Sequence, residues 1–397
     1  MKPRPSPRRR RRVLLLQSWW QDRLLEGVAR HAAQHNWILD CEMRWTHRVP
    51  ALHEWAGDGI IAYVGVTKPQ RPLLRFLRSQ RVPVVLTHSG HDGLRSPRVI
   101  IPHQEIGAAA AAHLLALNFR HFGFVEFGDN VIEQERAQGF QAAVEAAGGS
   151  FRVLRLKDLP RRLAGLPRPM GLFAINDLNA LAVIRACLDA GCRVPEEFAV
   201  VGADNTEILC NFAPVPLTSV NCNFEQQGYE AAALLDRLMR GGRAPAQPVV
   251  ISPQGVTVRA STDTIATPDP DVARALRFLR DHYREPISIR QVARVLGSSL
   301  RRVQPVFRRH IGHTMIHELM RLRVTHARRL LSDRRAKLEG VAAESGFANR
   351  HHLLRAFRRT TGETPSAYRA ALGMDAAGRP AAAGESAGRP GREEVGA

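Results

Sequence analysis

The chain has 397 residues, 44% of them hydrophobic, and a formal net charge of +20 at pH 7. This length exceeds one ordinary hydrophobic core, so it predicts two or three domains. No apolar run approaches the roughly 20 residues of a membrane-spanning helix, which argues against an integral membrane protein. Five scattered cysteines form no Cys-x-x-Cys pair, so we expect reduced thiols in a cytoplasmic protein, without a metal site or a cofactor.

The positive charge is concentrated at the two ends of the chain. Residues 271–369 hold 22 Lys and Arg against 8 Asp and Glu, and residues 1–12 hold seven basic residues and no acidic one. Residues 13–270 hold 25 of each sign and are neutral. The basic tail precedes only four apolar residues, too few for a secretion signal, and we expect it to be disordered. The larger basic segment predicts a polyanionic partner such as nucleic acid.

From residue 13 onwards, short apolar runs alternate with amphipathic stretches. The apolar runs predict strands at 13–16, 59–64, 82–86, 122–127, 171–175 and 198–202. Helical spacing of apolar residues predicts helices at 22–35, 73–79, 106–117, 136–147, 178–190 and 226–240. Strands that alternate with helices predict an α/β fold, with parallel sheets covered by helices on both faces.

The α/β part carries no recognisable catalytic or nucleotide-binding motif. No phosphate-binding glycine loop, nucleophile elbow or His-Glu-x-x-His follows any predicted strand. Open parallel sheets bind ligands beyond the carboxyl ends of their strands, so polar residues there are the candidates. Residues 260–270, small and polar with two prolines, predict a linker, and residues 373–397 predict a disordered tail. We therefore expect an α/β domain over 13–259 and a second domain over 271–372.

The second domain contains one pattern twice. In each copy a short apolar helix, at 289–296 and at 338–345, ends at a glycine, Gly297 or Gly346. A polar residue follows, and then a helix with arginines on its outer face, at 299–310 and at 350–361. This is the layout of a helix-turn-helix, whose second helix enters the major groove of DNA. Two copies, joined by a helix at 318–331, predict a chain that reads two successive groove segments.

Two stretches of the second copy, Val341-Ala-Ala-Glu-Ser-Gly-Phe347 and Gly362-Glu-Thr-Pro-Ser-Ala-Tyr-Arg369, resemble the AraC/XylS family of transcription regulators. In the α/β part, Asn176-Asp177, Val200-Val-Gly-Ala-Asp-Asn205 and Pro216-Leu-Thr-Ser-Val220 resemble the periplasmic-binding-protein-like sensor of LacI/GalR regulators. The resemblance covers residues 13–372. It implies a two-lobed sugar sensor of type I joined to an all-α DNA-binding domain with two helix-turn-helix motifs.

The resemblance also implies partners and a mode of action. We expect a homodimer that binds a double-stranded DNA operator, takes a sugar effector, D-xylose, and activates genes of pentose catabolism; a contact with RNA polymerase stays open. The alternatives are another sugar or a nucleoside as effector, repression in place of activation, and a sugar-binding protein without a transcriptional role. An enzyme is disfavoured because no nucleophile and base, metal cluster or phosphate loop can be named.

By the family layout, the second helix of each copy reads DNA. Side chains near its start are expected to reach base edges: Arg301, Arg302 and Gln304 in the first copy, and Arg350, His351, His352 and Arg355 in the second. Arginine suits this role because its fork meets O6 and N7 of guanine together. Ser298 or Ser299, and Asn349, are candidate N-caps. Phosphate contacts are expected further along, from Arg308, Arg309, Arg358 and Arg359.

Two residues depart from the family pattern in these helices. Pro305 lies inside the first reading helix, where it removes a backbone hydrogen bond and predicts a kink at a cost of about 3 kcal/mol. We therefore expect the first copy to read DNA less strictly than the second. Leu353 stands where the family often has an aromatic residue, a change that a packed core tolerates.

The resemblance also implies a set of effector-binding residues. Carboxylates and amides bind sugar hydroxyls, and an aromatic ring covers the apolar face of the sugar. The candidates are Trp19, Trp20, Asp22, Arg136 at a helix start, Asn176, Asp177, Asp204, Asn205 and Glu207. Structural roles compete with this interpretation: Asn176-Asp177 suits a helix N-cap, Asp204-Asn205 suits a turn, and the two tryptophans suit a core.

Overall fold

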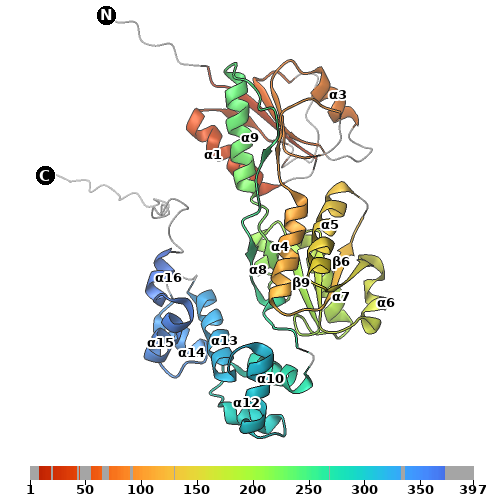
Figure 1. Cartoon of the computed structure of the whole chain (residues 1–397). Helices are drawn as coiled ribbons and strands as arrows, with labels where there is room; N and C mark the ends of the chain where they lie inside the picture. The colour runs from red at the N-terminus through yellow and green to blue at the C-terminus, as the bar shows by residue number, and fades with distance from the viewer. Residues whose placement is uncertain are drawn as a thin grey trace, which may run out of the picture. The chain divides into compact units, whose positions relative to one another are not determined.

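The computed structural model describes residues 9–18, 21–42, 44, 55–64, 71–89, 93–128, 130–267, 269–331 and 336–371 (Figure 1). Contacts divide the chain into two compact units, Met1–Ala266 and Thr267–Ala397. The first unit combines sheets and helices, and the described part of the second unit is helical. None of the helices among the described residues is long and apolar enough to cross a membrane.

The first sheet of the α/β unit has four parallel strands. In spatial order they are β2 (Ile38–Asp40), β1 (Arg12–Gln17), β3 (Gly59–Tyr63) and β4 (Val84–Leu86). Alternate residues of a strand point to opposite faces. Val13 and Leu15 accordingly pack with helices α1 (Asp22–His35) and α9 (Phe224–Met239), whereas Leu14 packs with α3 (Arg71–Ser79). The sheet is therefore buried on both sides, as its continuous apolar runs predict.

The second sheet is larger and has one antiparallel edge. In spatial order its strands are β12 (Val256–Thr257), β10 (Thr218–Val220), β9 (Phe198–Ala203), β8 (Met170–Ala174), β6 (His121–Glu126) and β7 (Ser150–Arg155). Helices α4 (His103–Ala116) and α5 (Val131–Ala146) cover one face over a core that includes Phe122, Phe140 and Phe173. The other face packs against α6 (Leu159–Arg162) and α7 (Asp177–Asp189).

The chain passes between the two sheets more than once. It leaves the first sheet after β5 (Val99–Ile100), returns after β10 to form α9, and crosses again between β11 (Val249–Val250) and β12. β11 pairs with β5, so residues about 150 positions apart in the sequence lie side by side at the crossing: Val249 pairs with Val99 and Val250 with Ile100. The α/β unit thus contains two main sheets and the short β5–β11 pair, which confirms the predicted two-lobed α/β architecture.

The predicted strands and helices of this unit are present, with one shifted helix that affects the site. The helix predicted at 136–147 begins at Val131, because Asn130 caps it. The side chain of Asn130 accepts from the amide of Glu133 at 3.0 Å, and the Glu133 carboxylate accepts from the amides of Phe127 and Gly128. Arg136 therefore lies inside the helix and not at its start. The short strands β2, β5, β7, β10, β11 and β12 were not predicted, since their sequences show too little apolar alternation.

Part of the segment predicted as a linker belongs to the α/β unit. Ala260–Thr262 forms a buried 3₁₀ turn. The hydroxyl of Ser261 donates to the carbonyl of Val200 at 2.6 Å and accepts from the amide of Thr218 at 2.8 Å. Small hydroxyl residues are typical of both linkers and satisfied turns, and only the neighbouring strands decide between them. The division between the two units falls after Ala266.

The second unit consists of two similar helical halves. Their helices are α10 (Pro270–His282), α11 (Ile289–Val295), α12 (Leu300–Ile311), α13 (Met315–Leu330), α14 (Leu338–Glu344), α15 (Arg350–Thr361) and α16 (Pro365–Ala371). The core of the second half includes Val341, Leu353 and Phe357. The predicted core role of Leu353 is confirmed, since its side chain is fully buried.

The predicted caps and turns of the two halves are confirmed. The side chain of Ser299 accepts from the amide of Arg302 at 3.3 Å, and that of Asn349 accepts from the amide of His352 at 2.9 Å. The turn glycines Gly297 and Gly346 have φ of 64° and 79°, a conformation that L-residues adopt only with strain. Pro305 lies within α12, which stays a single helix from Leu300 to Ile311.

Candidate functional site

Arg136 and Asp204 form a buried ion pair inside the α/β unit. Arg136 projects from α5, Asp204 directly follows β9, and their side chains are 4% and 11% exposed. Both terminal nitrogens of the guanidinium lie 3.3 Å from Oδ1 of Asp204. The guanidinium also donates to the carbonyl of Ile175, and its Nε donates to Nδ1 of His103 at 3.4 Å. These contacts engage each nitrogen of the guanidinium and fix its direction.

The backbone at Asp204 is strained. Asp204 and Asn205 have φ of 99° and 54°, both in the region that favours glycine. Such conformations cost about 1–3 kcal/mol in a non-glycine residue and occur preferentially at functional sites. Asn205 holds the turn in place: its amide donates to Oγ of Ser219 at 3.0 Å, and its side-chain oxygen accepts from Arg259 at 3.0 Å. The strained backbone therefore lowers the stability of the unit while it orients the Asp204 carboxylate.

Polar residues from the first sheet complete this cluster. Gln17 and Tyr63 are the last residues of β1 and β3. Gln21 follows β1; its side chain donates to Oδ2 of Asp204 at 3.3 Å, and its amide donates to Gln17 at 3.0 Å. The cluster thus joins the carboxyl ends of strands from both sheets, which is where open parallel sheets bind ligands.

Burial decides the protonation of the groups around the ion pair. Burial raises the pKa of Asp204, and the charge and hydrogen bonds of Arg136 oppose this shift. Burial raises the pKa of Tyr63 to about 12, so its phenol keeps its proton. Burial, followed by the charge of Arg136, lowers the pKa of His103 to about 3, so this imidazole is neutral. One ion pair is therefore surrounded by neutral donors and acceptors, a suitable environment for hydroxyl groups.

Asn176 and Asp177 stabilise the half of the α/β unit that contains the second sheet. The side chain of Asn176 accepts from the amide of Asn179 at 2.9 Å and caps α7. The Asp177 carboxylate accepts from Oγ of Ser219 at 2.5 Å and from the amide of Thr206 at 2.7 Å. Burial, and then the nearby Asp204, raise the pKa of Asp177. Both side chains thus have structural partners, and their contact with a ligand stays a prediction.

Two of the other predicted effector residues, Asp22 and Glu207, have charged partners outside the buried pair. Asp22 is paired with Arg44 at 2.7 Å, and Glu207, whose side chain is 70% exposed, lies 3.9 Å from Arg23. Trp19 and Trp20 lie outside the described residues. The structure therefore brings Arg136 and Asp204 together, with Asn205 as the adjacent support, and does not bring Asp22 and Glu207 to the same cluster.

Sequence reasoning missed Gln21, Tyr63 and His103. A signal for two of them was available, because Tyr63 lies one residue before the end of a predicted strand and Gln21 follows another strand closely. His103 gave no signal, since its role depends on the contact with Arg136, which is 33 positions away in the sequence.

The helices predicted to read DNA present basic outer faces. In both α12 and α15, buried residues such as Phe307 and Phe357 fix one side of the helix, which leaves the other side outward. The exposed residues among the predicted DNA contacts are Ser299, Arg301, Arg302, Arg308, Arg309, Asn349, Arg350, His351, His352, Arg355, Arg358 and Arg359. Gln304 is half-buried, and Arg350 lies 3.3 Å from Glu339 in an exposed ion pair.

Comparison with known proteins assigns both units. Residues 111–262 match the family described as periplasmic binding protein-like domain, and residues 292–371 match a helix-turn-helix domain family. The chain is a transcription regulator that joins a periplasmic binding protein-like domain to an AraC-type helix-turn-helix domain. Its function as a regulator agrees with the interpretation that it is not an enzyme.

Proteins similar to this regulator align with nearly its whole length. The chain is 26% identical over 387 residues to the xylose operon regulatory protein of Escherichia coli (strain K12), covering 91% of this chain and 97% of that protein. It is 23% identical over 367 residues to the protein of the same name from Haemophilus influenzae, covering 87% and 94%. A solved structure of the xylose-binding transcription activator XylR superposes with a TM-score of 0.69 at 24% identity, covering 91% and 98%, and shows the fold.

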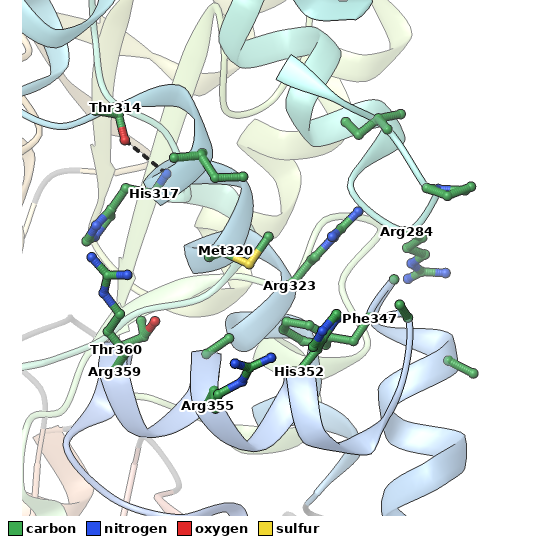
Figure 2. A pocket seen from close by; sticks show the side chains of 17 residues that line it. Arg284, Thr314, His317, Met320, Arg323, Phe347, His352, Arg355, Arg359 and Thr360 are labelled. Atoms are coloured by element: carbon green, nitrogen blue, oxygen red, sulfur yellow. Dashed lines mark hydrogen bonds between the residues drawn. The ribbon is translucent and has the colours of Figure 1, made fainter. Parts of the chain in front are cut away.

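The AraC-type domain contains an open cavity of about 740 Å³ beside its second reading helix. Figure 2 shows His352, Arg355 and Arg359 of α15 on one side of it, and His317 of α13 and Arg284 among the residues that line it. Met320 and Phe347 contribute apolar surface. Arg323 is bound to the carbonyls of Tyr283 and Glu285 at 2.7 Å and supports the wall. Sequence reasoning identified the α15 residues but missed Arg284 and His317, which lie outside the reading helices.

Proposed function

We propose that this regulator binds a small sugar, D-xylose, at the Arg136–Asp204 cluster and activates genes of pentose catabolism. One observation carries the proposal: a buried carboxylate on strained backbone, held by a fully engaged arginine at the strand ends of both sheets. The names of two relatives that span nearly the whole chain support xylose as the effector.

The chemistry of the cluster suits a polyol. The carboxylate of Asp204 accepts hydrogen bonds from hydroxyl groups, while the charge and hydrogen bonds of Arg136 oppose the rise in its pKa and orient it. Tyr63 and Gln21 add neutral donors from the other half of the unit. A sugar that takes over the place of Gln21 at Oδ2 of Asp204 would contact both halves at once. A ligand that binds one arrangement of the halves better than another shifts the equilibrium between them by that difference in affinity.

The test of the effector is a calorimetric titration of the full chain with D-xylose, beside L-arabinose, D-ribose and D-glucose. We expect saturable heat with D-xylose and its loss in Asp204→Asn. The matched control is Asp189→Asn, the same chemical change at an exposed residue of α7. If only another sugar gives saturable heat, that sugar and not D-xylose is the effector. If Asp204→Asn and Asp189→Asn give equal heat, the binding site lies elsewhere.

The AraC-type domain is proposed to read DNA with α12 and α15. Arg355 and His351 lie on the exposed face of α15 for contacts with base edges, and Arg358 and Arg359 follow for phosphates. Arg284 and His317, across the cavity from α15, are suited to hold phosphates of the same DNA segment. This extends the predicted contact surface beyond the reading helices.

Salt-dependent binding to promoter DNA tests these assignments. Arg355→Ala should weaken binding by about 1–3 kcal/mol and relax the sequence preference, whereas Arg359→Ala should weaken all sequences alike and reduce the salt slope by about 1. Arg274→Ala is the control, because this arginine is half-exposed and paired with Asp271 at 2.7 Å within α10. Equal losses in all three variants would contradict the division into base and phosphate contacts.

The regulator is proposed to act as a homodimer. Each subunit would then place its two helix-turn-helix motifs on one of two adjacent half-sites. Sedimentation of the full chain with and without D-xylose measures this state directly. Transcription in vitro from a promoter with the operator then distinguishes activation, which we propose, from repression.

A further inference from the structure

His31 is a buried histidine on the first helix of the α/β unit. It lies in α1 and is 4% exposed. Neither ring nitrogen has a hydrogen-bond partner within the part of the chain that the structure describes. Its neighbours are rings: His35 with centroids 4.2 Å apart, and Trp37 and Tyr229 each at 5.2 Å. Buried polar atoms nearly always have a partner, so two unused nitrogens in one ring need an explanation.

Two further side chains with ligand atoms lie next to His31. His35 follows one turn later on α1, where residues four apart share a helix face. Asp236 comes from α9, the helix that packs along α1, and is 7% exposed. One ligand atom from each of the three residues lies within 4.8 Å of the others. Two imidazoles and one carboxylate form a donor set that zinc and related transition metals accept.

An arginine side chain now provides the positive charge in this cluster. Nη2 of Arg240 lies 2.7 Å from Oδ2 of Asp236 and 3.4 Å from Nδ1 of His35. The Arg240 side chain is 58% exposed and stands at the end of α9, so it can turn into solvent. Arg11 binds the other oxygen, Oδ1 of Asp236, at 3.0 Å. One carboxylate oxygen can thus be released while the other keeps the carboxylate in place.

We propose that His31, His35 and Asp236 form a binding site for a divalent transition-metal ion, for which zinc is the probe. Each imidazole supplies one nitrogen, Asp236 supplies Oδ2 once Arg240 has turned away, and water completes the tetrahedron that zinc prefers. Arg11 stays on Oδ1 and orients the ligating carboxylate from outside. The cysteine spacing, which predicts no metal, does not bear on this site; its sequence signal is the pair His31-Ala-Ala-Gln-His35.

A metal ion at this place would connect the two helices that cover one face of the first sheet. Because binding requires α1 and α9 to be packed, the ion would stabilise the folded unit, and the stabilisation would grow with the logarithm of the ion concentration once that exceeds the dissociation constant. The site is separate from the Arg136–Asp204 cluster, so its test does not depend on the proposed effector.

The test is a zinc titration of the full, tag-free chain after chelator treatment, read by competition with a coloured zinc indicator. We expect one zinc per chain in the wild type and affinity weakened at least about tenfold in His35→Ala. His282→Ala is the matched control, since His282 is also a helical histidine whose ring lies beside another ring, that of Phe278, with centroids 4.4 Å apart. Arg240→Ala should bind zinc more tightly, because it removes the competing cation.

The absence of stoichiometric zinc binding in the wild type would overturn the proposal. Unchanged affinity in His35→Ala, or loss of the site in His282→Ala in its place, would overturn it as well. His31→Phe keeps an aromatic ring in the core, and tryptophan fluorescence and circular dichroism show whether each variant is folded. A folded His31→Phe protein that still binds one zinc with wild-type affinity would likewise exclude His31 as a ligand.

Discussion

The two terminal nitrogens of Arg136 converge on a single carboxylate oxygen of Asp204, at 3.3 Å each, and leave the other oxygen to Gln21. This division gives the carboxylate one fixed and one exchangeable side. The fixed oxygen, Oδ1, contacts Arg136 in the half that contains the second sheet. The exchangeable oxygen, Oδ2, contacts Gln21, which follows β1. A ligand can therefore compete for Oδ2 without breaking the ion pair.

Removal of either partner of this pair should destabilise the α/β unit strongly. We expect Asp204→Asn and Arg136→Gln each to lower the free energy of unfolding by about 3–5 kcal/mol, because each leaves an uncompensated buried group. The double variant should lose less than the sum of the two. Urea unfolding followed by tryptophan fluorescence measures this, since all five tryptophans lie in residues 19–55. Additive losses would show that the two side chains do not stabilise each other.

The turn glycines of the two helix-turn-helix copies should respond differently to alanine. Both have positive φ, so each substitution strains the backbone by about 1–2 kcal/mol. A Cβ at Gly346 would also collide with the carbonyl of Tyr283 and lie 2.8 Å from Cα of Arg284, whereas none of the described atoms lies within 4 Å of a Cβ at Gly297. Thermal unfolding followed by circular dichroism should therefore show a larger loss in Gly346→Ala than in Gly297→Ala, and equal losses would contradict the collision.

Pro305 should lower the stability of the first reading helix. It lies in the interior of α12 and cannot donate the hydrogen bond that an amide would give there. We expect Pro305→Ala to raise the free energy of unfolding of the helical unit by up to about 3 kcal/mol. DNA binding by the first copy should then become stricter, measured as a larger penalty for base changes in its half-site. Lower stability in Pro305→Ala would mean that the proline ring packs favourably where it stands.

Glu318 should make the helical unit sensitive to acid. Burial opposes ionisation, but hydrogen bonds from Arg321 at 2.6 Å and His313 at 2.9 Å lower the pKa of Glu318 to about 2. A carboxyl with a depressed folded pKa contributes stability above its unfolded pKa and loses it as the pH falls toward the folded value. The shift corresponds to about 3 kcal/mol.

The variant Glu318→Gln isolates this contribution. The difference in unfolding free energy between wild type and variant should be largest above pH 5 and shrink as the pH approaches 2. Circular dichroism should report the change while tryptophan fluorescence stays constant, because the tryptophans belong to the other unit. A difference that does not depend on pH would show that the carboxylate's charge is not the cause.

The fold class and the two exposed basic helices of the helix-turn-helix copies could be predicted from the sequence alone. Apolar runs buried on both faces identify parallel strands, and a repeated helix, glycine, cap and basic helix identify a helix-turn-helix. These signals are local: Ser299, Asn349, Gly297 and Gly346 act on residues within a few positions along the chain. Local physics of capping and backbone conformation can be recognised without knowing what packs against it.

The tertiary structure alone decided which polar residues form the buried site. Arg136 meets Asp204 across 68 positions and His103 across 33, and Gln21 meets Asp204 across 183. Asn176 and Asp177 carry the same residue types at a strand end, yet they bind backbone and hydroxyl groups of their own half. Polar residue types at the ends of strands occur both in the Arg136–Asp204 cluster and at Asn176 and Asp177. Burial and the direction of each side chain, which follow from how distant strands and helices pack, separate the site from the scaffold.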